Sequence, residues 1–150
     1  MSKIGLLAFL GLCLVASKAG AQILKPVTWS YGAKKVSATE AIVFFKATID
    51  QGWHVYSQHI KDGGPVKTSF TFTPSKDFTL DGPTAEPKPV VRMEKAFNME
   101  IGFFEHAVIF SQKVKLKTGA TTVSGTLEYM TCNDNQCLPP EDIQFNVPVK

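Results

Sequence analysis

The sequence predicts an all-β protein, and three observations support this class. Short runs rich in Val, Ile, Phe, Thr and Tyr follow one another along the chain. Gly, Pro, Asp or Asn interrupts these runs roughly every eight to twelve residues, which is the spacing of strands and turns in sandwiches and barrels. No segment repeats its apolar residues with the period of an amphipathic helix.

Four candidate strands lie in the first half of the sequence. The second of them, residues 40–49, is so apolar that we expect it to be buried on both faces. The third follows a turn at residues 50–52, and the fourth alternates, with Phe70 and Phe72 on one face and threonine on the other. The four runs are residues 27–33, 40–49, 53–58 and 68–73.

The candidate strands of the second half alternate more regularly. In the runs at residues 108–117 and 123–129, one face is apolar and the other is polar, as in a strand with one buried face. A further pair of runs, residues 126–131 and 143–149, flanks a short segment with two cysteines and predicts a hairpin. The predicted inward residues are Val108, Phe110, Val114, Leu116, Val123, Leu127 and Tyr129; the outward ones are Lys113, Lys115, Lys117, Ser124, Thr126 and Glu128.

About eight or nine such strands in one domain predict a β-sandwich of immunoglobulin-like type. The Cys…Trp…Cys spacing of antibody domains is absent, so the likeness is one of architecture. Residues 61–66 look like a loop, and residues 88–104 show no assignable pattern. No repeat or linker divides the chain, and we expect a single domain over residues 22–150.

The first residues predict a cleavable signal peptide over residues 1–21. Lys3 gives a positive start, and the apolar run 4–16 is too short to span a membrane. The small residues 19–21 suit signal peptidase, which would cut before Gln22. Cys13 would be removed with this segment, so we expect an exported protein whose thiol chemistry is confined to two cysteines.

Composition excludes two classes of partner. Cleavage would remove two of the 16 basic residues, Lys3 and Lys18, and leave the 13 acidic ones, so the formal charge would fall from +3 to +1. No basic stripe predicts nucleic-acid binding. No second apolar stretch predicts a membrane span in the mature chain.

Cys132 and Cys137 lie at the predicted hairpin tip, with four residues between them. If Leu127 and Tyr129 face the core, strand alternation places Cys132 on the accessible side. Pro139 and Pro140 remove two backbone donors directly afterwards, which indicates a loop or an edge. In an oxidising compartment such a pair is expected to form a disulfide.

The pattern alone leaves the role of this pair open. Closing so short a loop removes little entropy from the unfolded chain, about 2 kcal/mol against about 4 to 5 kcal/mol for a long loop, which favours a redox role. Short structural disulfides are nevertheless common in exported domains, so a binding module with a braced hairpin remains an alternative. A metal site is a third; zinc would need help from His54, His59 or His106, and copper(I) from Met93, Met99 or Met130.

The cysteine segment resembles a known family. The run Tyr129-Met130-Thr131-Cys132, followed by Cys137-Leu138-Pro139-Pro140-Glu141, is similar to the N-terminal periplasmic domain of the thiol:disulfide interchange protein DsbD. The upstream segment, residues 50–58, resembles the Gly-aromatic-x-x-Tyr segment of that family. The two cysteines stand one residue closer together than in its best-known member.

This resemblance implies a periplasmic thiol–disulfide oxidoreductase of protein-disulfide reductase type that needs no cofactor and no metal. A membrane-embedded electron-transporting thiol reductase, with its thioredoxin-like domain, would reduce the cysteine pair. The pair would then reduce oxidised thioredoxin-fold proteins of the periplasm. By the same resemblance, Cys137 would form mixed disulfides with partners and Cys132 would resolve them.

The resemblance also implies a cap over the cysteines. The segment 93–99 would take the place of the cap loop of the family, with Phe97 as the covering ring, and Tyr56 would line the same site. No helix N-terminus is predicted nearby to lower a thiol pKa. Activation of the thiol would then have to come from a local carboxylate acting as base or from the partner protein. The candidate carboxylates are Asp134, Glu94 and Glu141.

Overall fold

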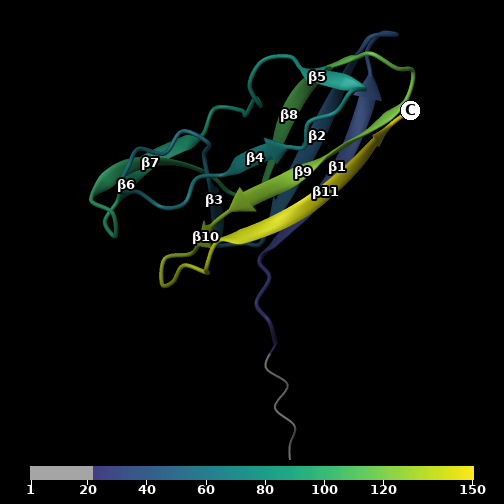
Figure 1. Ribbon diagram of the computed structural model, residues 1–150. Helices are drawn as coiled ribbons and strands as arrows, with labels where there is room; N and C mark the ends of the chain where they lie inside the picture. The colour runs from purple at the N-terminus through teal and green to yellow at the C-terminus, as the bar shows by residue number, and fades with distance from the viewer. Residues whose placement is uncertain (1–21) are drawn as a thin grey trace, which may run out of the picture.

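Antiparallel strand pairing organises residues 22–150, the part of the chain that the computed structural model describes (Figure 1). The predicted signal peptide lies outside these residues. Eleven strands and no helix occur within them. The strands are β1 (Val27–Lys35), β2 (Glu40–Ile49), β3 (His54–Tyr56), β4 (Ser69–Phe72), β5 (Phe78–Leu80), β6 (Val90–Glu94), β7 (Met99–Phe104), β8 (Ala107–Leu116), β9 (Thr121–Tyr129), β10 (Thr131–Cys132) and β11 (Glu141–Val149).

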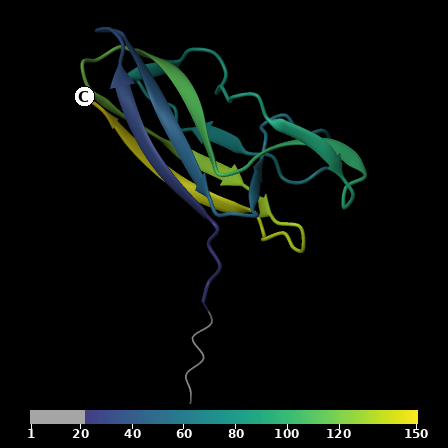
Figure 2. The ribbon, with the colours of Figure 1, turned by 180° about the vertical axis from the view of Figure 1, so that it is seen from behind.

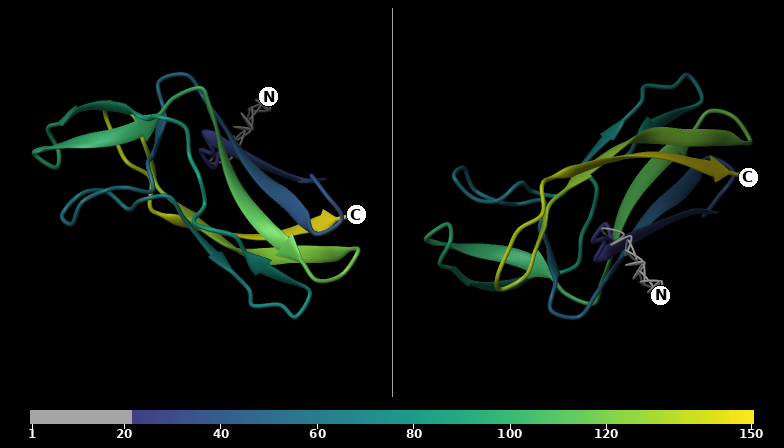
Figure 3. Two further views of the ribbon diagram at one scale, coloured as in Figure 1. Left: turned by 90° about the horizontal axis from the view of Figure 1, so that it is seen from above. Right: turned by 90° about the horizontal axis from the view of Figure 1, so that it is seen from below.

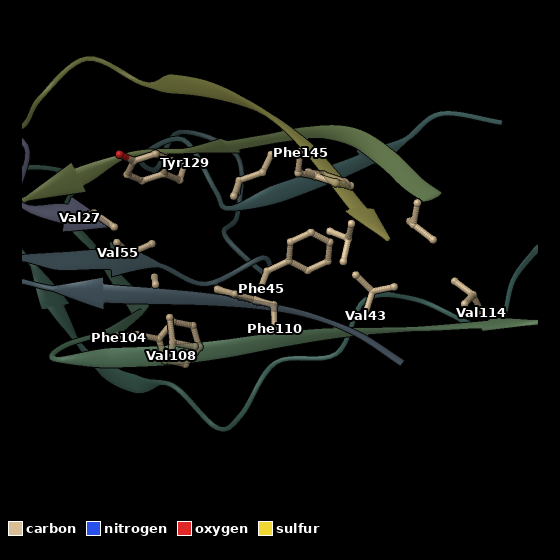
Figure 4. Close-up of a cluster of buried hydrophobic side chains, with 14 of the residues drawn as sticks. Val27, Val43, Phe45, Val55, Phe104, Val108, Phe110, Val114, Tyr129 and Phe145 are labelled. Carbon is tan, nitrogen blue, oxygen red and sulfur yellow. The ribbon is translucent and has the colours of Figure 1, made fainter. Parts of the chain in front are cut away.

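Two of the three sheets face each other and form the predicted immunoglobulin-like β-sandwich. The first sheet has the order β1-β2-β8-β5, and the second has the order β11-β9-β4. Along one side the layers meet where β1 lies beside β11. Side chains from both layers fill the space between them (Figure 4). Phe45 of β2 joins the layers, because its ring centroid is 4.7 Å from that of Phe70 on β4 and 4.7 Å from that of Phe145 on β11.

Strand alternation predicts most of this core correctly. The seven residues expected to face inward on β8 and β9 are all buried, and the lysines opposite them are exposed. The expectation that residues 40–49 are buried on both faces is wrong. On β2 the alternate residues from Ala41 to Ile49 are buried, whereas Lys46 and Thr48 are exposed. The physical reason is that the outer face of the first sheet carries no covering layer, so a central strand of that sheet buries one side only.

The third sheet, with the order β10-β3-β7-β6, extends from one end of the sandwich (Figures 1 and 2). We call it the site sheet. Its β6–β7 hairpin occupies the stretch 88–104 that the sequence pattern left unassigned, while residues 61–66 form a loop as expected. Seen from above, the hairpin and the segment between β10 and β11 project at the same end of the molecule (Figure 3).

The short strand β3 connects the site sheet to the sandwich. Its middle residue, Val55, belongs to the main core between the layers. Its outer residues, His54 and Tyr56, point to the opposite face because side chains alternate along a strand. One strand of three residues therefore supplies both the core and the face on which the cysteines lie.

Gly125 allows a close approach between β4 and β9, and this generates a stability prediction. A Cβ atom at this position would collide with the carbonyl oxygen of Thr71 and lie 2.7 Å from Cζ of Phe145. We expect Gly125→Ala to lower the free energy of unfolding by about 1 to 3 kcal/mol, the usual cost of overpacking a well-packed interior. Gly119→Ala is the matched control, because nothing lies within 4 Å of its added Cβ. Urea unfolding at equal m value measures both; equal midpoints would contradict the prediction.

Candidate functional site: a disulfide at the end of the sandwich

Cys132 and Cys137 form a disulfide with an S–S distance of 2.06 Å and a Cα–Cα distance of 4.0 Å. The β9–β11 hairpin pairs as far as Tyr129 and Glu141, and the disulfide closes the connection beyond that point. The expectation that the two cysteines meet across a hairpin tip is confirmed.

The segment between the cysteines is ordered by hydrogen bonds of its own. The Asn133 side-chain oxygen accepts from the backbone N–H groups of Asn135 and Gln136, at 2.9 and 2.8 Å. The Asn133 N–H donates to the Gln136 carbonyl at 2.9 Å, and the Leu138 N–H donates to the Thr131 carbonyl at 3.0 Å. These bonds hold the tip in place independently of the sulfur–sulfur bond.

The two sulfurs differ in their access to solvent. Cys132 is 2 % exposed, whereas Cys137 belongs to an exposed stretch of the tip. The expectation that Cys132 faces the accessible side is therefore wrong. Its premise was a regular strand, but the chain leaves β9 after Tyr129 and its next strand, β10, pairs with β3 of another sheet. This change of partner interrupts the alternation, and Thr131 and Cys132 are both buried.

Cys132 lies on one face of the site sheet with several aromatic side chains. It pairs directly with His54 across β10 and β3, and Tyr56 on the same strand pairs with Phe103 of β7. Cys132, Tyr56, Phe103 and Ile101 form a buried cluster separate from the main core, which we call the site cluster. Partly buried side chains pack against it, namely Ile60, Phe97, Met99 and Met130.

Hydrogen bonds outside the sheet fix the position of β3 and so of Tyr56. The Thr68 hydroxyl donates to the Tyr56 carbonyl at 2.6 Å. Immediately after the strand, the Glu86 carboxylate accepts from the Ser57 hydroxyl and, at 2.8 Å, from the Gln58 N–H. The strand that carries Tyr56 is therefore tied to two loops as well as to its neighbours.

A pocket of about 250 Å³ lies over the disulfide. It brings together both cysteines and the three residues that the family resemblance placed around them, Phe97, Glu94 and Tyr56. Phe97 reaches it from the β6–β7 turn, where its N–H donates to the Glu94 carbonyl at 3.2 Å. The lining residues are Tyr56, Glu94, Ala96, Phe97, Cys132, Asn133, Asp134, Asn135, Gln136 and Cys137.

Two of the three candidate carboxylates border this pocket. Glu94 and Asp134 are among its lining residues, and Asp134 lies 4.0 Å from the Arg92 guanidinium. Glu141 does not line it; its carboxylate accepts a hydrogen bond from the Tyr129 hydroxyl at 3.1 Å. The position of Glu141 therefore does not support a role as base, since its carboxylate is hydrogen-bonded to Tyr129 outside the pocket.

Sequence patterns missed two neighbours of the site, Arg92 and His54. The Arg92 guanidinium lies 4.2 Å from the centroid of the Phe103 ring, a cation–π contact, and so places a positive charge beside the site cluster. Burial is the main cause that lowers the pKa of His54, and Arg92 lowers it further. Burial also raises the pKa of Tyr56 to about 12, with a contribution from the nearby Glu94 carboxylate. Both His54 and Tyr56 are consequently uncharged at neutral pH.

Only some of the residues considered for metal binding lie near the cysteines, namely His54, Met99 and Met130. Within residues 22–150, no three side chains of His, Cys, Asp or Glu type come together as a candidate metal set. His59 and His106 are exposed, as is Met93 on β6. Met99 and Met130 pack against the site cluster as apolar side chains.

An immunoglobulin-like sandwich with a half-buried disulfide in a pocket at one end is the arrangement expected of a thiol–disulfide exchange domain. The sequence comparison gives the family. The model of the N-terminal domain of the thiol:disulfide interchange protein DsbD matches residues 21–148, and the chain belongs to this family. The resemblance noted from the cysteine segment is thereby confirmed. No curated protein sequence matches the chain.

Solved structures similar to this one include domains of the same family. The DsbD N-terminal domain of Neisseria meningitidis in its reduced form is 17 % identical, with a TM-score of 0.50 over 76 % of this chain and 80 % of that one. The N-terminal periplasmic domain of ScsB from Proteus mirabilis is 20 % identical, with a TM-score of 0.56; the match covers 80 % of this chain but 44 % of that one. The third structure is the complex between the DsbD and PilB N-terminal domains of N. meningitidis. The matched chain is 16 % identical, with a TM-score of 0.54 over 83 % of this chain and 87 % of that one. At these identities the structures support the fold.

Proposed function

We propose that residues 22–150 act in the periplasm, after removal of the signal peptide 1–21, as a carrier of electrons through Cys132 and Cys137. A membrane electron-transporting thiol reductase and its thioredoxin-like domain would reduce the pair, and oxidised thioredoxin-fold proteins would accept the electrons. The observation that carries this proposal is the unequal exposure of the two sulfurs inside one pocket. Family membership, the periplasmic ScsB domain, the reduced DsbD domain and the DsbD–PilB complex support it. Within residues 22–150, no helix has the length and apolar character needed to cross a membrane.

The exchange requires only thiolates and disulfides. In the reduced domain, the Cys137 thiolate attacks a sulfur of the acceptor disulfide, and the other acceptor sulfur leaves as a thiolate with the bonding electron pair. The Cys132 thiolate then attacks the Cys137 sulfur, which re-forms the internal disulfide and releases the second acceptor sulfur. Two electrons have passed to the acceptor, and its two thiolates take up protons from solvent.

The unequal exposure of the two cysteines supports the roles proposed for them in this scheme. A partner sulfur must approach Cys137 in line with the bond that breaks, and Cys137 lies in an exposed stretch of the tip. Cys132 is buried on β10, within bonding distance of Cys137 but away from partners. It is therefore suited to the second, intramolecular step.

Phe97 is proposed as a cap on this site. Its ring packs against the site cluster and lines the pocket that holds both sulfurs, together with Glu94 and Tyr56. A ring in this place limits the approach of small oxidants. A partner protein would displace it by making contacts of its own, so specificity would come from the turn between β6 and β7.

A redox titration of the folded domain separates this function from that of a binding module with a structural disulfide. We expect the pair to equilibrate with dithiothreitol mixtures while the fold is intact, at a reduction potential well above the value of about −300 mV below which structural disulfides typically lie. Alkylation of free thiols measures the reduced fraction, and near-ultraviolet circular dichroism monitors the fold. A disulfide that resists reduction until the domain unfolds would favour the binding module.

Trapping distinguishes the two cysteines. Reduced Cys132→Ser, mixed with a purified oxidised thioredoxin, should accumulate a mixed disulfide through Cys137, because the resolving thiol is missing. Cys137→Ser should accumulate little, since its remaining thiol is buried. Non-reducing electrophoresis and mass spectrometry identify the adducts. Equal trapping by both variants would overturn the assignment.

Replacement of the cap ring should expose the reduced pair. We expect Phe97→Ala to react severalfold faster than the wild type with a small oxidant such as hydroxyethyl disulfide, because the pocket loses its aromatic cover. Met93→Ala is the matched control, since Met93 lies on the same hairpin but is 58 % exposed and does not line the pocket. Equal rates for Phe97→Ala and Met93→Ala would mean that the ring is no barrier.

A further inference from the structure

His54 is a buried polar side chain beside the disulfide that the proposed exchange scheme does not use. It is 2 % exposed and pairs directly with Cys132 across β3 and β10. Directly opposite residues of antiparallel strands project on the same face, with Cβ atoms about 4.5 to 5.5 Å apart. The imidazole therefore lies next to the Cys132 side chain, whose sulfur is the buried one of the pair.

The orientation of the imidazole is fixed on two sides by aromatic rings. Its centroid is 5.1 Å from that of Tyr56, with the two planes at 85°, and 5.1 Å from that of Phe103. Its Nε2 atom lies 3.1 Å from the Tyr56 hydroxyl oxygen. His54 is thus held in one place and makes one side-chain hydrogen bond, to a residue that lines the disulfide pocket.

The direction of this hydrogen bond decides what the Tyr56 hydroxyl can do. A phenol has one proton to donate, and its oxygen can also accept. When Nε2 carries the imidazole proton and donates it to Tyr56, the phenol proton is free to point into the pocket that Tyr56 shares with Cys132 and Cys137. Burial keeps both groups uncharged at neutral pH.

The charged groups around His54 come from three neighbouring elements. Arg92 and Glu94 lie on β6, Glu105 follows β7, and Asp134 lies in the tip between the cysteines. Arg92 opposes protonation of the imidazole and the three carboxylates favour it, but burial is the largest effect and keeps it neutral.

We propose that His54 is a positioning residue for the exchange: it donates from Nε2 to the Tyr56 hydroxyl and so directs the Tyr56 proton to the Cys132 sulfur. This inference rests on the proposed function. While Cys137 is bonded to a partner, Cys132 is a free thiol in a buried position, where a thiolate lacks solvation. A hydrogen bond from Tyr56 stabilises that thiolate, so Cys132 releases its proton to solvent more readily. The thiolate then attacks the Cys137 sulfur and the partner sulfur leaves with the electron pair, while Tyr56 keeps its own proton.

The two steps can be timed separately with Ellman's disulfide, 5,5′-dithiobis(2-nitrobenzoate), as the oxidised probe. Attack by Cys137 releases the first coloured thiolate, and attack by Cys132 on the resulting adduct releases the second. We expect His54→Phe, which keeps an aromatic ring but has no donor, to slow the second release about tenfold at pH 7. The Tyr56 proton is then no longer directed to Cys132, and the thiolate loses one hydrogen bond to a charged group, which is worth about that factor. The pH–rate profile of this step should move upward by about one unit, and the first release should be unchanged.

Three further proteins make the test specific to the hydrogen bond. His54→Gln, whose side-chain N–H₂ reaches about as far as Nε2, should restore most of the rate and the profile. Tyr56→Phe should slow the second release as His54→Phe does, and the double variant should be no slower than either, because both act through one bond. If His54→Phe does not fold, His54→Leu, which also lacks a donor, takes its place.

The outcomes separate this inference from the proposed function. A normal second release in both His54→Phe and Tyr56→Phe overturns the positioning role and leaves the electron carrier intact. Additive slowing in the double variant, or failure of His54→Gln to restore the pH profile, also overturns it. A wild-type protein that gives no second release would overturn the proposed function itself, and the inference with it.

Discussion

The pairing of β10 with β3 is the interaction on which the site depends. It joins Thr131 and Cys132, in the connection between β9 and β11, to a strand that is already fixed in the sandwich through Val55. The Thr131 hydroxyl adds a buried hydrogen bond of 2.9 Å to the His54 carbonyl. The pairing places Cys132 on the site sheet, where it is buried, while Cys137 stays in the exposed stretch of the tip. The unequal sulfurs thus follow from one short ladder between two sheets.

The sequence predicts the sandwich well and the site sheet poorly, for one physical reason. Long strands with a buried face and a solvent face, such as β8 and β9, alternate visibly because each residue meets either the core or water. The β6 strand has no such contrast, since Val90, Val91 and Met93 are all exposed. Alternation of apolar and polar residues reflects burial of one face, so a strand outside the main core shows little alternation in its sequence.

Residue type located the cysteines, and family motifs located Phe97, Glu94 and Tyr56, but neither gave their geometry. Parity along β9 placed Cys132 on the wrong side, because a change of sheet after Tyr129 has no signature in the alternation itself. Glu141 was a candidate base because its carboxylate is close to the cysteines in the sequence, whereas in the structure that carboxylate accepts a hydrogen bond from the Tyr129 hydroxyl. His54 was considered only as a metal ligand, since its pairing with Cys132 joins residues far apart in the sequence.

The separation of the site cluster from the main core has a consequence for dynamics. The turn of the β6–β7 hairpin, which carries Phe97, packs on the site cluster, whereas Phe104 at the far end of β7 belongs to the main core. Its opening would expose a few apolar side chains and would leave the interlayer contacts of Phe45 in place. Proteins can open locally at a lower free-energy cost than global unfolding. An opening confined to this turn would uncover the sulfurs without separating the two layers of the sandwich.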